Sequence, residues 1–85
     1  MDTKIALVTG GTSGIGKEIV LELLREGCKV ITCYSQNEEN ALKLENEVGD
    51  DNLKIIKCDI SNEESVIEMV NIIKEKYGSI DYLVN

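Results

Sequence analysis

The sequence has no histidine and no proline. Without histidine, the side chain that most often transfers protons in enzymes near neutral pH is missing. Without proline or a low-complexity tract, nothing divides the 85 residues into separate domains. A chain of this length buries about 60% of its unfolded surface, so we expect one small domain of modest stability.

Basic residues are also scarce: 9 lysines and arginines face 16 aspartates and glutamates, which gives a net charge of -7. Nucleic acids and anionic membranes are bound by clustered basic residues, so we expect neither as a partner. Any anionic ligand must be held by local dipoles.

Long apolar runs are missing too. No run approaches the ~20 residues of a membrane span, and the N-terminal "MDTKIALV" lacks the pattern of a secretory signal. We therefore expect a soluble, cytoplasmic protein. The cysteines Cys28, Cys33 and Cys58 form no C-x-x-C pair and lie among apolar residues, so they are predicted to be buried thiols, without a disulfide or a metal site.

Strand-like and helix-like patterns alternate along the chain. Four short apolar segments, 4–9, 29–34, 53–58 and 80–85, read as strands, and the first two are nearly continuous, as in strands covered on both faces. Between them, apolar residues return at helical spacing before a glycine: Ile15, Ile19 and Leu23 before Gly27; Ala41, Leu44 and Val48 before Gly49; Val66, Met69, Val70, Ile73 and Tyr77 before Gly78.

Two helix starts carry capping signals. Asn37 is predicted to cap the second helix, with Glu38 and Glu39 in its first turn. Ser61 is predicted to cap the third helix, with Glu64 reaching back to complete a capping box.

The resulting order βαβαβαβ predicts an α/β fold with a Rossmann-like parallel sheet. Residues 1–85 would form a partial Rossmann domain that lacks the C-terminal half of the doubly wound fold. The fourth strand would leave an exposed apolar edge, so we expect either that another chain covers it or that the natural protein continues.

The stretch "TGGTSGIGK", residues 9–17, joins the first strand to the first helix, and it has three interpretations. A purely structural turn needs fewer glycines. A phosphate-binding P-loop would need a serine or threonine after Lys17, where this chain has Glu18, whose carboxylate repels phosphates.

A dinucleotide site fits the stretch best. Gly10 would make the turn, Gly14 would let the backbone approach a pyrophosphate, and Gly16 would let the helix pack on the strand. Amide groups at the helix start, aided by the helix dipole, would then bind the anion.

Three motifs resemble the short-chain dehydrogenase/reductase family: "TGGTSGIG" (9–16), "CDIS" (58–61) and "IDYLVN" (80–85). The segment 34–48 is further similar to bacterial 3-oxoacyl-acyl-carrier-protein reductases, although sugar-alcohol and steroid dehydrogenases share much of it. The resemblance implies a homo-oligomeric NAD(P)-dependent oxidoreductase, of which this chain corresponds to the N-terminal portion.

The resemblance also implies roles for single residues. Thr12, Ser13, Gly14 and Ile15 would line the pyrophosphate and ribose, Asp59 and Ile60 would hold the adenine ring, and Asn85 would be the first asparagine of the family's Asn-Asn-Ala-Gly motif. Structural alternatives stay open: Asp59 as a loop or helix-start charge, and Asn85 as an ordinary strand end.

The family's catalytic Tyr-x-x-x-Lys is not present. Tyr34 is followed four residues later by Glu38 and Tyr77 by Asp81, while Tyr82 has no such partner, so no catalytic residue is predicted and the chain alone should be inactive.

The second strand ends in Tyr34 and Ser35, without the carboxylate that binds the ribose of NAD. With Ser13, these hydroxyls favour NADP over NAD. A stand-alone nucleotide-binding or assembly module without catalysis is the alternative function.

Overall fold

The computed structural model describes residues 3–49 and 51–85, and this part of the chain alternates four strands with three helices. The strands are β1 (Ile5–Thr9), β2 (Lys29–Tyr34), β3 (Leu53–Lys57) and β4 (Tyr82–Val84), and the helices are α1 (Gly14–Arg25), α2 (Glu38–Val48) and α3 (Glu63–Tyr77). All strand pairs are parallel, which confirms the predicted Rossmann-like α/β fold.

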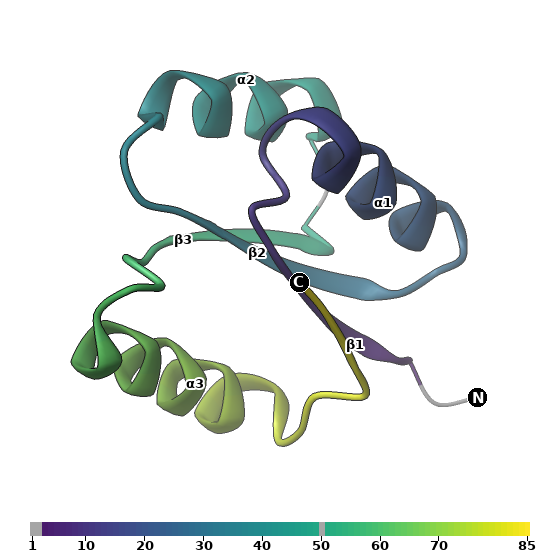
Figure 1. Cartoon of the computed structure of the whole chain (residues 1–85). Coiled ribbons are helices and arrows are strands. Elements are labelled where there is room, and N and C mark those ends of the chain that lie inside the picture. The colour runs from purple at the N-terminus through teal and green to yellow at the C-terminus, as the bar shows by residue number, and fades with distance from the viewer. Residues whose placement is uncertain (1–2, 50) are drawn as a thin grey trace.

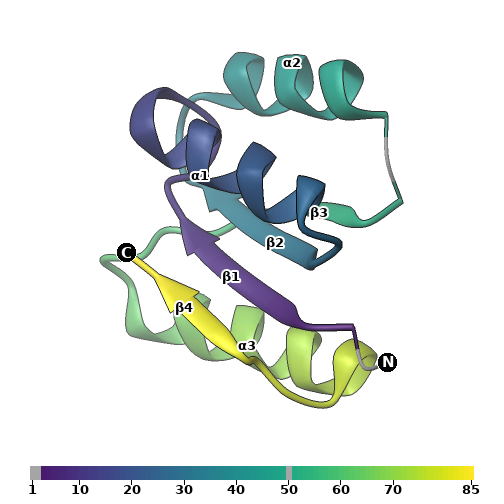
Figure 2. The same ribbon diagram turned by 90° about the vertical axis from the view of Figure 1, so that its right-hand side faces the viewer.

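The strands lie in the order β3-β2-β1-β4, so the chain reverses its direction of travel across the sheet after β3. Helices α1 and α2 cover one face and α3 covers the other (Figures 1 and 2). The reversal puts a topological switch point between β1 and β4. Open α/β sheets bind their ligands at such a point, beside the carboxyl ends of the strands.

Each face of the sheet has its own core. The core between the sheet and α3 consists of Ile5, Leu7, Ile31, Cys33, Cys58, Met69 and Ile73. The core between the sheet and helices α1 and α2 consists of Ala6, Val8, Val20, Cys28, Val30 and Leu44. Residues of β1 and β2 alternate between the two clusters, which confirms that these strands are covered on both sides. The three cysteines are buried and free, as predicted.

Three strands are shorter than predicted: β1 begins at Ile5, β3 ends at Lys57, and β4 covers only Tyr82–Val84. The fourth strand begins later because both the backbone and the side chain of Asp81 bond to Ile5, in place of a regular strand pairing. The Asp81 amide donates to the Ile5 carbonyl at 2.8 Å, while the Asp81 carboxylate accepts from the Ile5 amide at 2.8 Å. The regular ladder with β1 therefore starts at Tyr82.

The predicted capping box of Ser61 and Glu64 is wrong by one residue. Asn62 is the N-cap of α3, and its side chain accepts a hydrogen bond from the Ser65 amide at 3.1 Å. The Ser61 hydroxyl instead donates to the Asp59 carboxylate at 2.6 Å. Asn37 caps α2 as predicted, by accepting from the Asn40 amide at 3.1 Å.

The predicted apolar stripe of α1 is confirmed at Ile19 and Leu23 and wrong at Ile15. Ile15 is 81% exposed, whereas Val20, which the prediction left out, is fully buried. Ile19, Leu23 and Leu24 are partly buried beside Val20. Ile15 belongs to the first turn, which is free of the core.

Among the described residues, no helix combines the length and the apolar character that a membrane crossing requires.

Candidate functional site

The glycine turn leaves β1 at its carboxyl end and enters α1 at its amino end, beside the switch point (Figure 2). Gly10 has φ +70° and Gly14 has φ +58°, a conformation that side chains with a Cβ rarely adopt. Gly16 packs so closely on the turn that a Cβ there would collide with the Gly10 carbonyl. The three glycines therefore allow both the bend and the close approach of the helix.

The inner side of the turn is buried and bonded to β2. Gly11 and Thr12 are buried, and the Gly11 amide donates to the Thr32 hydroxyl at 2.9 Å. That hydroxyl in turn donates to the Val8 carbonyl at 2.6 Å.

The outer side of the turn is open to solvent. Ser13, Gly14 and Ile15 are exposed, and a Cβ built on Gly14 would meet no atom within 4 Å. Ser13 is the N-cap of α1, but its side chain makes no capping hydrogen bond, and the first turn has no acidic residue. The positive end of the helix dipole is therefore offered to an external anion.

The other predicted binding residues follow the remaining strands at the same edge of the sheet. Tyr34 ends β2 with Ser35 after it, Asp59 and Ile60 follow β3, and Asn85 follows β4. Contacts hold neighbouring tips together: the Cys58 amide donates to the Tyr34 carbonyl at 2.8 Å, and the Thr9 hydroxyl lies 3.3 Å from the Asn85 side-chain oxygen. Ser35, Asp59, Ile60 and Asn85 are exposed, and Tyr34 is partly buried.

The charges of the site follow from hydrogen bonding and burial. Hydrogen bonds from the Ser61 hydroxyl and amide lower the pKa of Asp59, so this carboxylate is ionised at neutral pH. Burial raises the pKa of the Cys33 thiol, which therefore stays neutral beneath the turn. No negative charge of Cys33 opposes an anion at the start of α1.

The carboxylates and the lysine near the turn are engaged elsewhere. Glu38 and Glu39 lie in the first turn of α2, as predicted, so the tip of β2 carries only Tyr34 and Ser35. Lys17 pairs with Glu47 near the end of α2, at 3.2 Å. A P-loop lysine would bind phosphate, so this ion pair speaks against that interpretation.

Sequence reasoning missed Thr32 as a support of the turn. The signal was present in the strand "KVITCY", where a threonine stands in an otherwise apolar buried segment. A buried hydroxyl needs hydrogen-bond partners. Near the carboxyl end of β2, where Thr32 lies, the adjacent backbone is the end of β1 and the glycine turn that follows it.

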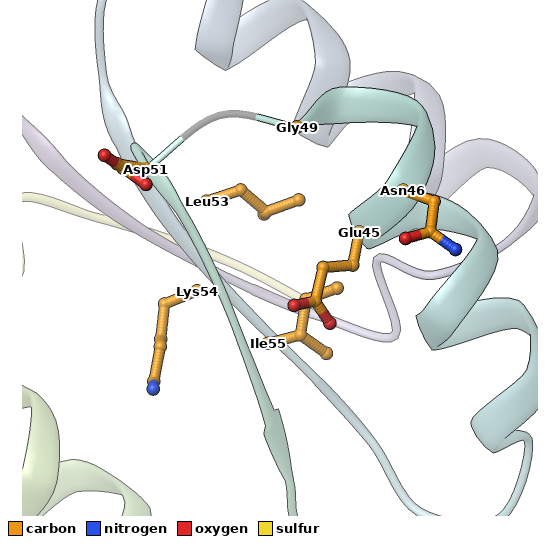
Figure 3. A pocket seen from close by; sticks show the side chains of 7 residues that line it. All are labelled: Glu45, Asn46, Gly49, Asp51, Leu53, Lys54 and Ile55. Carbon is orange, nitrogen blue, oxygen red and sulfur yellow. The ribbon is translucent and has the colours of Figure 1, made fainter.

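A hollow lies beside the edge strand β3, away from the glycine turn (Figure 3). It is lined by Glu45, Asn46, Gly49, Asp51, Leu53, Lys54 and Ile55. Its two carboxylates make it a poor site for a phosphate. In the described part of the chain, no three histidine, cysteine or acidic side chains gather as metal ligands would.

Comparison with known proteins agrees with this geometry. The family model described as short chain dehydrogenase matches residues 4–85. L-rhamnose-1-dehydrogenase of Scheffersomyces stipitis is 36% identical over 90 aligned residues, which cover 100% of this chain and 35% of that protein. A protein of Streptomyces coelicolor, provisionally named ketoacyl reductase, is 36% identical over 86 residues, with 99% of this chain and 33% of that protein covered.

Among solved structures, a Bacillus thuringiensis protein with the provisional name 3-oxoacyl-reductase superposes with a TM-score of 0.93 at 27% identity. The match covers 99% of this chain and 36% of that one. The chain thus spans about a third of the length of the relatives that it matches.

Proposed function

This chain belongs to the short-chain dehydrogenase family, and from that membership we propose that it is the N-terminal, cofactor-binding portion of an oxidoreductase. The reaction proposed for the whole enzyme is hydride transfer between NADP or NAD and a carbonyl or alcohol carbon. The observation that carries the proposal is the start of α1, which lies at the switch point of the sheet with no side-chain cap and no acidic residue in its first turn.

The residues present fit a dinucleotide. The backbone at Gly10 and Gly14 has open space where a Cβ would stand, so a pyrophosphate can approach it closely. The pyrophosphate and ribose are proposed to be held by Thr12, Ser13, Gly14 and Ile15. The adenosine side of the cofactor would contact Tyr34 and Ser35, and its adenine ring would contact Asp59 and Ile60. Asn85, at the end of β4, would contact the cofactor as the first asparagine of the family's Asn-Asn-Ala-Gly motif. The nicotinamide, when bound, supplies or accepts the hydride. This chain's residues bind and orient the dinucleotide.

NADP is the proposed cofactor, with NAD as the alternative. The tip of β2 offers the Ser35 hydroxyl and no carboxylate, and Ser13 adds a second exposed hydroxyl at the turn. Hydroxyls can donate to a 2′-phosphate, whereas a carboxylate would repel it. Lys17 contributes no charge there while it pairs with Glu47.

Fluorescence titration of the protein with NADPH, NADH and magnesium-ATP tests this proposal. NADPH should bind most tightly, NADH more weakly and magnesium-ATP least. Binding of magnesium-ATP without any binding of NADPH would favour a phosphotransferase and overturn the proposal. Tighter binding of NADH would reverse the cofactor preference alone.

The substrate proposed for the whole enzyme is a 3-oxoacyl group, because two of the similar proteins carry the names ketoacyl reductase and 3-oxoacyl-reductase. A sugar alcohol is the alternative, and the related name in the comparison is that of a sugar dehydrogenase, L-rhamnose-1-dehydrogenase. The 85-residue chain lacks the tyrosine and lysine spacing of the family's proton donor, so we expect it to be inactive by itself. Ketone-dependent NADPH oxidation by the purified chain, free of longer forms, would contradict this expectation. The predicted homo-oligomer and cytoplasmic location remain to be checked by light scattering and cell fractionation of the natural-length protein.

The edge strand β4 favours a second candidate, a nucleotide-binding or assembly module. In the described residues β4 pairs only with β1, and Tyr82 and Leu83 are 48% and 62% exposed. A partner strand could pair with this edge. The module predicts a stable, homogeneous oligomer of the 85-residue chain, whereas an enzyme portion predicts aggregation or weak order; light scattering distinguishes the two.

A further inference from the structure

Thr32 of β2 holds the glycine turn from the α1 face of the sheet. Its hydroxyl accepts from the Gly11 amide, and Val20 packs against the same glycine. The Gly11 amide therefore depends on a side chain of another strand.

The Thr32 hydroxyl has two partners in the same turn. It donates to the Val8 carbonyl at 2.6 Å and accepts from the Gly11 amide at 2.9 Å. These two groups are three residues apart, and in an ordinary β-turn they would bond to each other directly. The hydroxyl stands between them and keeps the turn open.

We propose that Thr32 is a positioning residue of the cofactor site, whose buried hydroxyl holds the turn 8–11 open and thereby sets the first turn of α1 for a dinucleotide pyrophosphate. This inference rests on the function proposed above. Thr32 itself is fully buried and acts through the backbone of Gly11.

Loss of the Thr32 hydroxyl should weaken dinucleotide binding more than it destabilises the fold. Without it, the buried Gly11 amide either lacks an acceptor or closes directly on the Val8 carbonyl. Direct closure draws Gly11 toward β1 and shifts the exposed amides that follow it. The site then has to reorganise when the ligand binds, and preorganisation is lost.

The experiment uses the protein at its natural length and compares Thr32→Val, which keeps the shape, with Thr32→Ser, which keeps the hydroxyl. Ile31→Val is the matched control, because Ile31 is equally buried in β2 but belongs to the other face of the sheet. The readouts are the NADPH dissociation constant, the chemical shift and exchange rate of the Gly11 amide, and the unfolding midpoint.

We expect Thr32→Val to weaken NADPH binding about tenfold and to move the Gly11 amide signal. Thr32→Ser should restore both, and Ile31→Val should lower the unfolding midpoint without changing either. Unchanged affinity in folded Thr32→Val overturns the inference, as does a Thr32→Ser variant that binds as weakly as Thr32→Val.

If Thr32→Val does not fold, hydrogen exchange of the wild-type protein without cofactor decides. A Gly11 amide that exchanges far more slowly than the exposed Ser13 amide supports the inference, and equal rates overturn it. If the wild type binds no dinucleotide at all, the proposed function fails, while the Gly11 amide still reports whether Thr32 holds the turn.

Discussion

The amino end of α1 differs from those of α2 and α3. Asn37 caps α2 and Asn62 caps α3, each by accepting from the amide three residues later. Each of these helices also has two glutamates in its first turn. At α1 the N-cap is Ser13, whose side chain accepts no such bond, and no acidic residue follows in the first turn.

The difference separates two structural helix ends from the end at which we propose binding. In α2 and α3 the positive end of the dipole is compensated within the chain, which stabilises the fold. In α1 no side-chain cap and no acidic residue of the first turn compensates it, and the third residue of the helix, Gly16, has no side chain. The proposed function uses this end of α1 to bind an anion without a basic patch.

The variant with the largest expected effect on NADPH binding is Gly16→Ala. Its Cβ would collide with the Gly10 carbonyl, so helix and turn must separate. We expect NADPH affinity to fall by at least about 100-fold, or about 3 kcal/mol, together with a lower unfolding midpoint. Titration and thermal unfolding measure both.

Asn40→Ala is the matched control, since Asn40 is the third residue of α2. It should leave affinity unchanged, because a Cβ is already accommodated there. If both variants bound NADPH like the wild type, the close packing of Gly16 would have no bearing on the site.

Gly14→Ala and Gly49→Ala form a pair with similar backbone strain. Their φ angles are +58° and +55°, and neither added Cβ meets an atom closer than 4.0 Å. Each should lose about 1–2 kcal/mol of stability. Only Gly14→Ala should also weaken NADPH binding, about tenfold, because its methyl group occupies the open side of the turn. Equal affinities for the two variants would move the pyrophosphate away from Gly14.

Much of this arrangement could be predicted from the sequence because its signals are local. Helix-ending glycines, the Asn37 cap and the glycine turn each depend on neighbours in the chain. The errors arose where two groups compete for one partner. Asp59 binds Ser61, two residues away, and leaves the cap to Asn62. Asp81 binds Ile5, far away in the chain, and displaces the first pairing of β4. The role of Thr32 required the register of β1 and β2, which periodicity does not give.

Substitution of the N-cap residues by alanine should change the unfolding free energy at one helix and the NADPH affinity at another. Asn62→Ala removes a capping bond and should cost about 1 kcal/mol of unfolding free energy without changing NADPH affinity. Ser13→Ala removes no capping bond and should leave stability unchanged, while affinity falls about fivefold through one lost hydrogen bond. Urea unfolding and NADPH titration of both variants provide the measurement; a stability loss in Ser13→Ala would show a cap that forms in solution.

The smallest effect concerns Asp59, which stands beside the capped start of α3 and is also proposed to contact adenine. Hydrogen bonds from Ser61 lower the pKa of Asp59 below its ordinary value, so the folded state favours the ionised carboxylate. Its stabilising contribution is therefore present above the unfolded pKa and is lost as the pH falls through the folded pKa. The difference in unfolding midpoint between wild type and Asp59→Asn should shrink over that acidic range. Ser61→Ala removes the hydroxyl bond, which is the largest cause of the lowered pKa, but keeps the bond from the Ser61 amide, so it should reduce the pH dependence of this difference. Ser13→Ala should preserve it, because the start of α1 has no carboxylate to titrate.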